Sequence, residues 1–397
     1  MCMKNEMQKF SLLRTLRSLR GKKWFRIVSA TVLDTLFVLM LGYFLLYRCT
    51  NWYNGDRVFF IPADTIYLLT DIFLWAAVAL EFVCSPIRAL AAAALMLLRG
   101  RPDISYPQLL VCESLLLTLV CNLGSRRNNR NAWLAIHAVG IEILFFLRMK
   151  GLVVPSYDIG MGEVFSYPGT SLALGNVNSL AILGLTMLMM LWLPRKWKPS
   201  TSFVIFLLGA EVMMFVTQCR TLVVLMVVLP LFAWLMERQK EDSKGNVVFW
   251  SITPLIGVLI TFLLSLYAVQ HKIPATAQEV DAFWQRFTDY RVIRDYSFTL
   301  FGSVGTGPYT GINFDNFYWW LLHYCGLIPT ILLLAAYGLM NIRLYKRKEF
   351  RLLTLSVMFL IYGLMENALI YPFHFFVPLL AFARPDETES KGKDEIK

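Results

Sequence analysis

The chain has 397 residues, of which 57% are hydrophobic and 16% are charged, and its formal net charge at pH 7 is +11. This composition excludes an ordinary soluble globular protein, in which charged residues make up about a quarter of the chain. A nucleic-acid-binding protein would also be basic, but here much of the positive charge lies in short loops between long apolar runs. We therefore predict an all-α, polytopic transmembrane protein that binds no nucleic acid.

The first predicted element is a basic amphipathic segment, residues 1–26. Between Lys9 and Arg26, leucines recur at helical spacing among basic side chains, a pattern typical of a helix lying on an anionic membrane surface. The apolar run that follows is long enough to cross a membrane, and it ends in the bulky residues Leu46-Tyr47-Arg48 in place of a signal-peptide cleavage site. We predict a signal anchor preceded by a cytoplasmic arm.

Twelve apolar runs follow one another along the chain, and a membrane-spanning helix requires about 20 predominantly apolar residues. Two of the runs, Pro86–Leu98 and Pro372–Ala383, are shorter than a full span. The other ten lie near Ile27–Tyr47, Ile61–Val83, Pro107–Leu123, Ala132–Leu147, Ser171–Leu193, Ser202–Val216, Thr221–Met236, Val247–Val269, Asn316–Leu339 and Leu352–Tyr371.

Loop charges predict the orientation, because short cytoplasmic loops of membrane proteins accumulate Lys and Arg. The basic stretches are residues 4–26, 126–130, 195–198, 238–244 and 343–351. All of them fall on the cytoplasmic side only if Pro86–Leu98 crosses the membrane. The sequence therefore predicts about 12 spans with both termini cytoplasmic and a single polytopic membrane domain over residues 27–383. Residues 271–315 form a large external loop, and residues 384–397 form a charged cytoplasmic tail.

Acidic residues interrupt several predicted spans, and each destabilises its span by a few kcal/mol unless it is paired or hydrated. We expect most of them to form interhelical hydrogen bonds or to pair with Arg88. Glu366 differs, because it lies near the outer end of its span and can contribute to an external site. The others are Asp34, Asp71, Glu81, Glu113, Glu142 and Glu211.

The sequence lacks the motifs of nucleotide and metal chemistry. It has no glycine-rich loop followed by Lys-Ser/Thr, and no Asp-x-Asp pair that would hold the metal of a nucleotide sugar. Its seven cysteines lack the spacing of a metal or redox site, so we expect no required disulfide. We predict no cofactor and no metal, and any chemistry must then use a donor that is already activated.

Four local patterns fall on the predicted outer face, and polar or charged residues are prominent in each. An arginine cluster in the external loop, Arg286 with Arg291 and Arg294, favours an anionic ligand. The patterns are Gly175 to Asn178 at the start of a span, the turn Thr217-Gln218-Cys219-Arg220, Arg286 upstream of Leu300-Phe301-Gly302, and Asp315-Asn316 before an aromatic-rich helix start followed by His323-Tyr324-Cys325-Gly326.

In this order and on this topology, the patterns resemble those of the Wzy-type bacterial polysaccharide polymerases of the O-antigen ligase and polymerase superfamily. The resemblance covers roughly residues 171–378. That family tends to show a Gly-x-x-Asn element, a Thr-x-x-Arg turn, a loop arginine before Leu-Phe-Gly, an Asp-Asn or His-Asn pair that opens the next helix, and a late glutamate. The corresponding residues here are Gly175 with Asn178, Arg220, Arg286, Asp315 with Asn316, and Glu366.

The resemblance implies a metal-independent glycosyltransferase of the cytoplasmic membrane. Its substrates would be oligosaccharide repeat units carried on undecaprenyl diphosphate, joined at the outer face into capsular polysaccharide, exopolysaccharide or O-antigen. Membrane lipids surround such a protein, and a flippase and a chain-length regulator of the same pathway are possible partners.

Under this interpretation Arg220 and Arg286 neutralise the charge that grows on the departing diphosphate, because guanidinium groups bind phosphate bidentately and keep their charge. Asp315 is the predicted base that accepts the proton of the attacking hydroxyl. The base role is also open to His323 and His374, which lie near the same face.

The aromatic run after Asn316 has two interpretations. Asn316 and Tyr318, with Trp319 and Trp320, can hydrogen-bond to sugars and stack on them, or the two tryptophans can belong to an interfacial aromatic belt. Asp315 can likewise be a helix N-terminal charge. The remaining predicted substrate-binding residues are Asn178, Arg291, Arg294 and Glu366.

Two other function classes stay open. Ligases of the same superfamily usually carry a histidine where Asp315 stands, which favours a polymerase here. A lipid-linked oligosaccharide flippase or another transporter would also be polytopic, but it needs positive charge at mid-membrane depth, and in this sequence only Arg88 is placed there.

Overall fold

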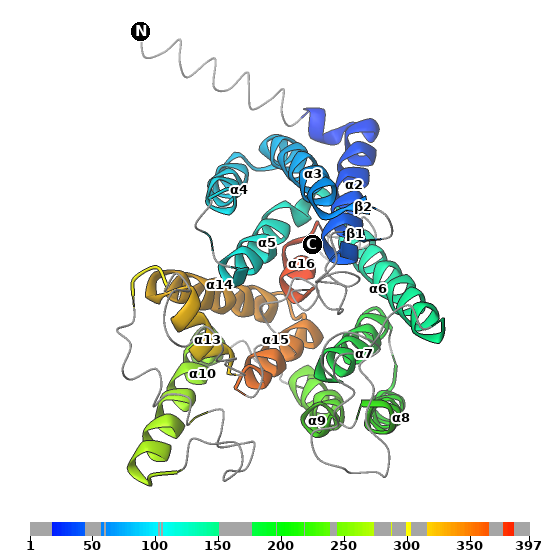
Figure 1. Ribbon diagram of the computed structural model, residues 1–397. Coiled ribbons are helices and arrows are strands. Elements are labelled where there is room, and N and C mark those ends of the chain that lie inside the picture. The colour runs from blue at the N-terminus through cyan, green and yellow to red at the C-terminus, as the bar shows by residue number, and fades with distance from the viewer. Residues whose placement is uncertain are drawn as a thin grey trace.

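Helices make up nearly all of the regular structure in the computed structural model of this chain (Figure 1). The structure describes residues 18–43, 57–58, 61–101, 104, 106–150, 177–195, 197–217, 219–238, 244–273, 287, 299–302, 316–364 and 376–384. Within these residues the strands are two short antiparallel segments, β1 (Arg57–Val58) and β2 (Ile61–Pro62). The predicted helical class is confirmed.

The first part of the bundle runs from α2 to α6. Its helices are α2 (Lys23–Phe37), which continues as the π-helix η1 (Val38–Gly42), α3 (Ala63–Cys84), α4 (Pro86–Arg99), α5 (Tyr106–Val120), which continues as the 3-10 helix η4 (Cys121–Leu123), and α6 (Arg126–Met149). The second part consists of α7 (Val177–Trp192), α8 (Pro199–Thr217), α9 (Arg220–Glu237), α10 (Lys244–Gln270), α13 (Phe317–Tyr324), α14 (Leu327–Lys346), α15 (Phe350–Tyr362) and α16 (Phe376–Phe382).

Each predicted apolar run contains a helix, and the structure corrects one run. Asn316–Leu339, predicted as one span, is divided into α13 and α14. The break falls at Cys325-Gly326, where Gly326 has a φ of +84°. This left-handed conformation is open to glycine but strained for other residues, so the helix cannot continue through it.

Within the described residues, six helical segments are long and apolar enough to cross a membrane. They are Lys23–Gly42, Asp64–Cys84, Arg126–Leu147, Pro199–Thr217, Gly245–Gln270 and Leu327–Lys346. Large apolar side chains are exposed along them, and on α14 the exposed fractions reach 65% for Leu332 and 67% for Leu339. Apolar surface of this extent suits lipid and not water. The chain is therefore a helical membrane protein.

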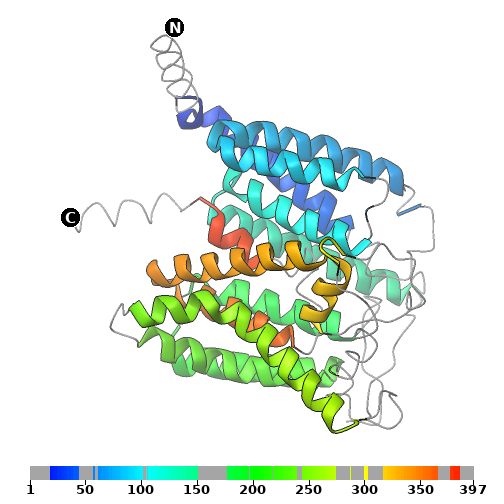
Figure 2. The same ribbon diagram turned by 90° about the vertical axis from the view of Figure 1, so that its left-hand side faces the viewer.

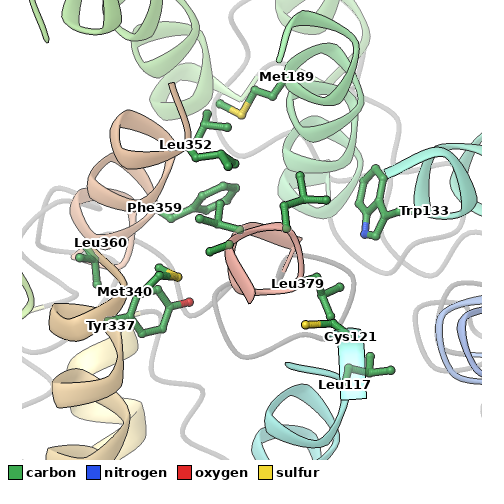
Figure 3. Close-up of a cluster of buried hydrophobic side chains, with 14 of the residues drawn as sticks. Leu117, Cys121, Trp133, Met189, Tyr337, Met340, Leu352, Phe359, Leu360 and Leu379 are labelled. Atoms are coloured by element: carbon green, nitrogen blue, oxygen red, sulfur yellow. The ribbon is translucent and has the colours of Figure 1, made fainter. Parts of the chain in front are cut away.

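The short helix α16 lies in the middle of the bundle, against α5, α6, α14 and α15. Figure 3 shows Leu379 of α16 surrounded by side chains from the neighbouring helices, among them Trp133 of α6 and Phe359 of α15. Leu379 and Trp133 are 2% and 1% exposed. A late segment of the chain thus lies at the centre of the core. Through its contacts, α16 joins the first part of the bundle to the second.

Successive helices run back and forth between two ends of the bundle (Figure 2). One end, called the basic end below, carries residues 123–126, 193–195, 197–198, 347–349 and 384. It is joined across the chain, because the Arg126 amide donates to Arg384 O at 2.8 Å and the guanidinium of Arg351 pairs with Glu237 at 2.9 Å. The start of α2 and the end of α16 lie at this end as well (Figure 2).

Three of the acidic residues within the helices form interhelical bonds, as predicted. Glu81 of α3 is paired with Arg88 of α4, at 3.5 Å. Asp71 of α3 and Glu113 of α5 are both bonded to Arg99 of α4, which reaches Glu113 at 3.3 Å. Arg99 ends α4 between α3 and α5, so its side chain meets both carboxylates, whereas Arg88 lies near the other end of the same helix.

Candidate functional site

The end opposite the basic end, called the site end below, gathers the predicted functional patterns. It carries α13, the turn between α13 and α14, residues 299–302, and residues 363–364 after α15. The N-termini of α7 and α9 also lie there (Figure 2). The described residues of the predicted patterns, widely separated in the sequence, thus share one end of the bundle.

Asn316 fixes the start of α13. Its side-chain Oδ1 accepts hydrogen bonds from the amides of Tyr318 and Trp319, at 3.0 and 3.1 Å, which is an N-cap arrangement. Its Nδ2 donates to Leu364 O at 2.9 Å and to Thr261 Oγ1 at 3.4 Å. One buried amide therefore joins α13 to α10 and to the turn after α15, and the capping role considered for Asp315 belongs to Asn316.

The aromatic residues of α13 are core residues. Tyr318 is fully buried and its hydroxyl donates to Leu360 O at 2.8 Å, while Trp319 Nε1 donates to Ser265 Oγ at 3.1 Å. Trp319 and Trp320 are only 3% and 5% exposed, so they form neither a sugar-stacking surface nor an interfacial belt in this structure. The hydrophobic gain of burying large rings, with hydrogen-bond partners for the polar tips of Tyr318 and Trp319, explains the difference.

The Leu300-Phe301-Gly302 pattern is docked on the turn after α13. The amides of Leu327 and Ile328 donate to Thr299 O and Leu300 O, at 3.1 and 3.0 Å. These bonds use two N–H groups at the start of α14 that have no partner within the helix. The third and fourth sequence patterns, which had no predicted contact, therefore form one unit.

Two glycines allow this close approach. Gly302 and Gly326 have φ values of +88° and +84°. A Cβ at Gly302 would collide with Tyr324 O, and a Cβ at Gly326 would collide with Gly302 N. Neither position accepts a side chain without moving the backbone. Each segment therefore needs a glycine where the other segment lies against it.

Gln108 of α5 completes the unit, and no sequence pattern indicated it. Its Nε2 donates to Phe301 O at 3.1 Å and to Tyr324 O at 3.0 Å. Both acceptors belong to the docked patterns, so one amide holds them from the first part of the bundle. A glutamine directly after Pro107 is indistinguishable in sequence from an ordinary polar residue at a helix start.

His323 is half-buried near the end of α13, outside the six long apolar segments. Its ring meets that of Tyr324 edge-on, with centroids 4.8 Å apart. Burial lowers the pKa of His323 from its ordinary value, so the neutral imidazole predominates at pH 7. A neutral imidazole can accept a proton, which is what a base role would require.

The other predicted site residues are located less fully. Arg220 is the first residue of α9 and Asn178 the second of α7, and the structure describes the backbone alone at both positions. Six residues lie outside the described part of the chain: Asp315, Arg286, Arg291, Arg294, Glu366 and His374. Substrate contacts of all these residues, and of Asn316, Tyr318 and His323, stay predictions.

In the described residues no group of three or more His, Cys, Asp or Glu side chains is placed to hold a metal ion. Comparisons of the chain with known protein families, characterised proteins and solved structures find no match.

Proposed function

We propose that this protein polymerises oligosaccharide repeat units carried on undecaprenyl diphosphate, at the outer face of the cytoplasmic membrane. The observation that carries the proposal is the docking of residues 299–302 on the α13–α14 turn, with Gln108 bonded to both. Two of the patterns on which the resemblance to Wzy-type polymerases rests are in direct contact, as parts of one site would be. The product is capsular polysaccharide, exopolysaccharide or O-antigen.

The proposed topology has 12 spans, formed by α2 to α10 and α14 to α16, with the basic end in the cytoplasm. The back-and-forth course of the helices and the basic loops gathered at one end support it. Residues 1–26 and 384–397 are then cytoplasmic, and residues 271–315 are external. The shorter spans, α4 and α16 among them, lie against longer helices. These neighbours surround the short helices with protein within the membrane.

The proposed chemistry is a direct displacement at the anomeric carbon of the donor sugar. The acceptor hydroxyl oxygen bonds to that carbon, the bond from the carbon to the diphosphate oxygen breaks, and the proton passes to Asp315. Arg220 and Arg286 take up the charge on the leaving diphosphate. The position of Arg220 at the N-terminus of α9 supports this role, because free backbone N–H groups and the helix dipole favour an anion there.

The described contacts support a positioning role for Asn316 and Gln108. Asp315 directly precedes Asn316, the N-cap of α13. The Asn316 side chain is bonded both to the start of α13 and to Leu364 O. A carboxylate next to such a fixed residue has a restricted range of positions, which a base needs. Arg291 and Arg294 are further diphosphate contacts, and Asn178, Glu366, His323 and His374 are proposed around the sugar units.

The test is chain growth by the purified protein in lipid vesicles, with synthetic diphosphate-linked repeat units as the sole substrate. Arg220→Ala and Arg286→Ala should each lower the rate about 10²–10³-fold, because each removes one charge contact that forms in the transition state. Lysine at either position should recover only part of the rate, since it keeps the charge but loses the planar fork. Asp315→Asn should stop transfer and leave donor binding intact.

The matched control is Lys272→Asn, which removes an exposed cation from the same face. Lys272 has a φ of +50°, a conformation that asparagine tolerates well. Near-normal chain growth in both arginine variants would overturn the proposal. Transfer to a different acceptor would favour a ligase, and substrate translocation without chain growth would favour a flippase.

A further inference from the structure

The described residues form a cavity at the basic end, away from the proposed catalytic site. It has a volume of about 380 Å³. Its walls come from the starts of α6 and α15, the turns after α7 and α14, the last residue of α9, and α16. The residues that line it are Arg126, Arg127, Arg130, Leu193, Pro194, Glu237, Lys348, Glu349, Phe350, Arg351, Leu352 and Leu380.

Two arginines hold the walls of the cavity together. Arg126 pairs with Glu349 at 3.0 Å and donates to Leu380 O at 3.2 Å. Arg351 pairs with Glu237 at 2.9 Å, and it donates to Trp192 O at 3.1 Å and to Arg195 O. These bonds join five separate segments of the chain, so the cavity is a built part of the fold.

The lining carries an excess of positive charge. It contains five cationic side chains and two carboxylates, which gives a net charge of +3. Both carboxylates pair with the wall arginines. The lining also carries Arg127, Lys348 and Arg130, whose guanidinium donates to Asn131 Oδ1 at 3.3 and 3.1 Å. Such a grouping attracts an anion, and arginine in particular matches the geometry of phosphate oxygens.

The backbone adds to the attraction. The helices α6 and α15 begin at Arg126 and Phe350, both in the lining, so the positive ends of two helix dipoles lie at the cavity, while the amides of Arg126 and Asn128 already donate to Arg384 O and Ser125 Oγ. The positive end of a helix dipole favours negative charge. Next to the charged part, Leu193, Leu352 and Leu380 provide an apolar wall.

We propose that this cavity binds a phosphate group. The chemistry has two sources at this location: the headgroup of an anionic phospholipid, whose acyl chains would follow the apolar wall, and a soluble phosphate anion. Basic pockets between membrane helices are suited to lipid headgroups on the cytoplasmic side. The binding does not depend on the proposed polymerase activity, since none of its residues belongs to the site end.

The experiment measures binding to the purified full chain. Thermal unfolding and native mass spectrometry are carried out with cardiolipin, with phosphatidylcholine as the neutral lipid, and with inorganic phosphate and pyrophosphate as the soluble anions. A ligand that binds the folded state raises the unfolding temperature. The cavity variant is Arg127→Gln/Arg130→Gln/Lys348→Asn, in which asparagine suits the φ of +58° at residue 348.

The control variant is Lys198→Gln/Arg238→Gln/Lys346→Gln, which removes three exposed cations at the same end but outside the lining. The cavity variant should bind about fivefold more weakly for each charge removed, and the control should bind as the unmodified chain does. Lys348→Asn alone, at an exposed position, gives a milder variant in case the triple one does not fold.

The outcomes distinguish the two sources of phosphate from each other, and two of them would overturn the proposal. Stabilisation by cardiolipin and not by the soluble anions identifies a lipid headgroup, and the reverse identifies a soluble phosphate. Equal effects of cardiolipin and phosphatidylcholine, with no effect of the soluble anions, would overturn the proposal. Equal weakening in the cavity and control variants would also overturn it, because general surface charge would then explain the binding.

Discussion

At the scale of single residues, Asn316 has more described bonds than any other predicted site residue. Its Oδ1 caps α13 and its Nδ2 joins Leu364 O and Thr261 Oγ1. Because the side chain is 1% exposed, water cannot replace these partners when the amide is removed. Asn316 is therefore needed for the local structure around Asp315, whatever contact it makes with substrate.

The first residue-scale prediction compares two substitutions of Asn316. Asn316→Ala should lower the free energy of unfolding by about 1 kcal/mol for the lost cap and by about 1–3 kcal/mol more for the buried carbonyl left without its donor. Asn316→Ser should recover the cap contribution alone, because a serine hydroxyl caps well but is too short to reach Leu364 O. Denaturant unfolding in detergent measures both. Equal stability of the alanine and serine variants would contradict the assigned cap.

At the scale of elements, the unit formed by residues 299–302 and the α13–α14 turn depends on Gly326. Gly326→Ala should separate the two segments, because a Cβ there meets Gly302 N and the φ of +84° disfavours alanine. The amides of Leu327 and Ile328, now bonded to Thr299 O and Leu300 O, should exchange with solvent much faster. Hydrogen exchange read by mass spectrometry measures this.

A matched glycine is available as the control. Gly100 ends α4 with a φ of −77°, and the nearest atom to an added Cβ is Met96 O at an ordinary 3.6 Å. Gly100→Ala should therefore leave the exchange of Leu327 and Ile328 unchanged. If Gly326→Ala also leaves it unchanged, the docked unit is not present in solution.

The sequence predicts the helices well, and the reason is physical. Apolar runs must form helices in a bilayer to satisfy their backbone polar groups, so runs such as Pro86–Leu98 give helices even when they are short. Side-chain partners follow from packing between distant segments, and periodicity carries no information about that. Asp71 and Glu113 meet Arg99 because α3, α4 and α5 are neighbours, and nothing in the spacing of the three residues indicates it.

The same limit applies to the candidate site. Its composition was predictable, because Asn316 and the Leu300-Phe301-Gly302 pattern are recognisable in sequence. The burial of Tyr318, Trp319 and Trp320 was not, since an aromatic-rich helix start is equally typical of a belt, a sugar surface or a core. Gln108 could not be found because its role depends on two carbonyl groups that lie 193 and 216 residues further along the chain.

At the scale of the whole molecule, the two ends of the bundle differ in character. The basic end joins its turns with arginine pairs, such as Arg126–Glu349 and Arg351–Glu237. The site end joins its segments with backbone and amide hydrogen bonds, from the amides of Leu327 and Ile328 and from the side chain of Gln108. Because Lys and Arg are retained on the cytoplasmic side of a membrane, this difference determines the proposed orientation.

The orientation can be tested with two engineered cysteines in a chain whose natural cysteines are replaced. His271 and Asn128 suit this purpose because both are exposed and they lie at opposite ends of the bundle. In intact cells a membrane-impermeant thiol reagent should label His271→Cys and should leave Asn128→Cys unlabelled until the membrane is permeabilised. The four described buried cysteines, Cys112, Cys121, Cys219 and Cys325, are shielded by packing, so they should contribute little background even where replacement is incomplete.

The reverse labelling pattern would show that the orientation is opposite to the proposed one, with residues 271–315 in the cytoplasm. Lipid-linked repeat units on the outer face could then not reach Arg286 or Asp315, and the polymerase proposal would fail. Labelling of both cysteines in intact cells would instead place both on the outer face, which requires an even number of spans between Asn128 and His271. The proposed topology has five such crossings, through α6, α7, α8, α9 and α10, so labelling of both cysteines in intact cells would contradict that count.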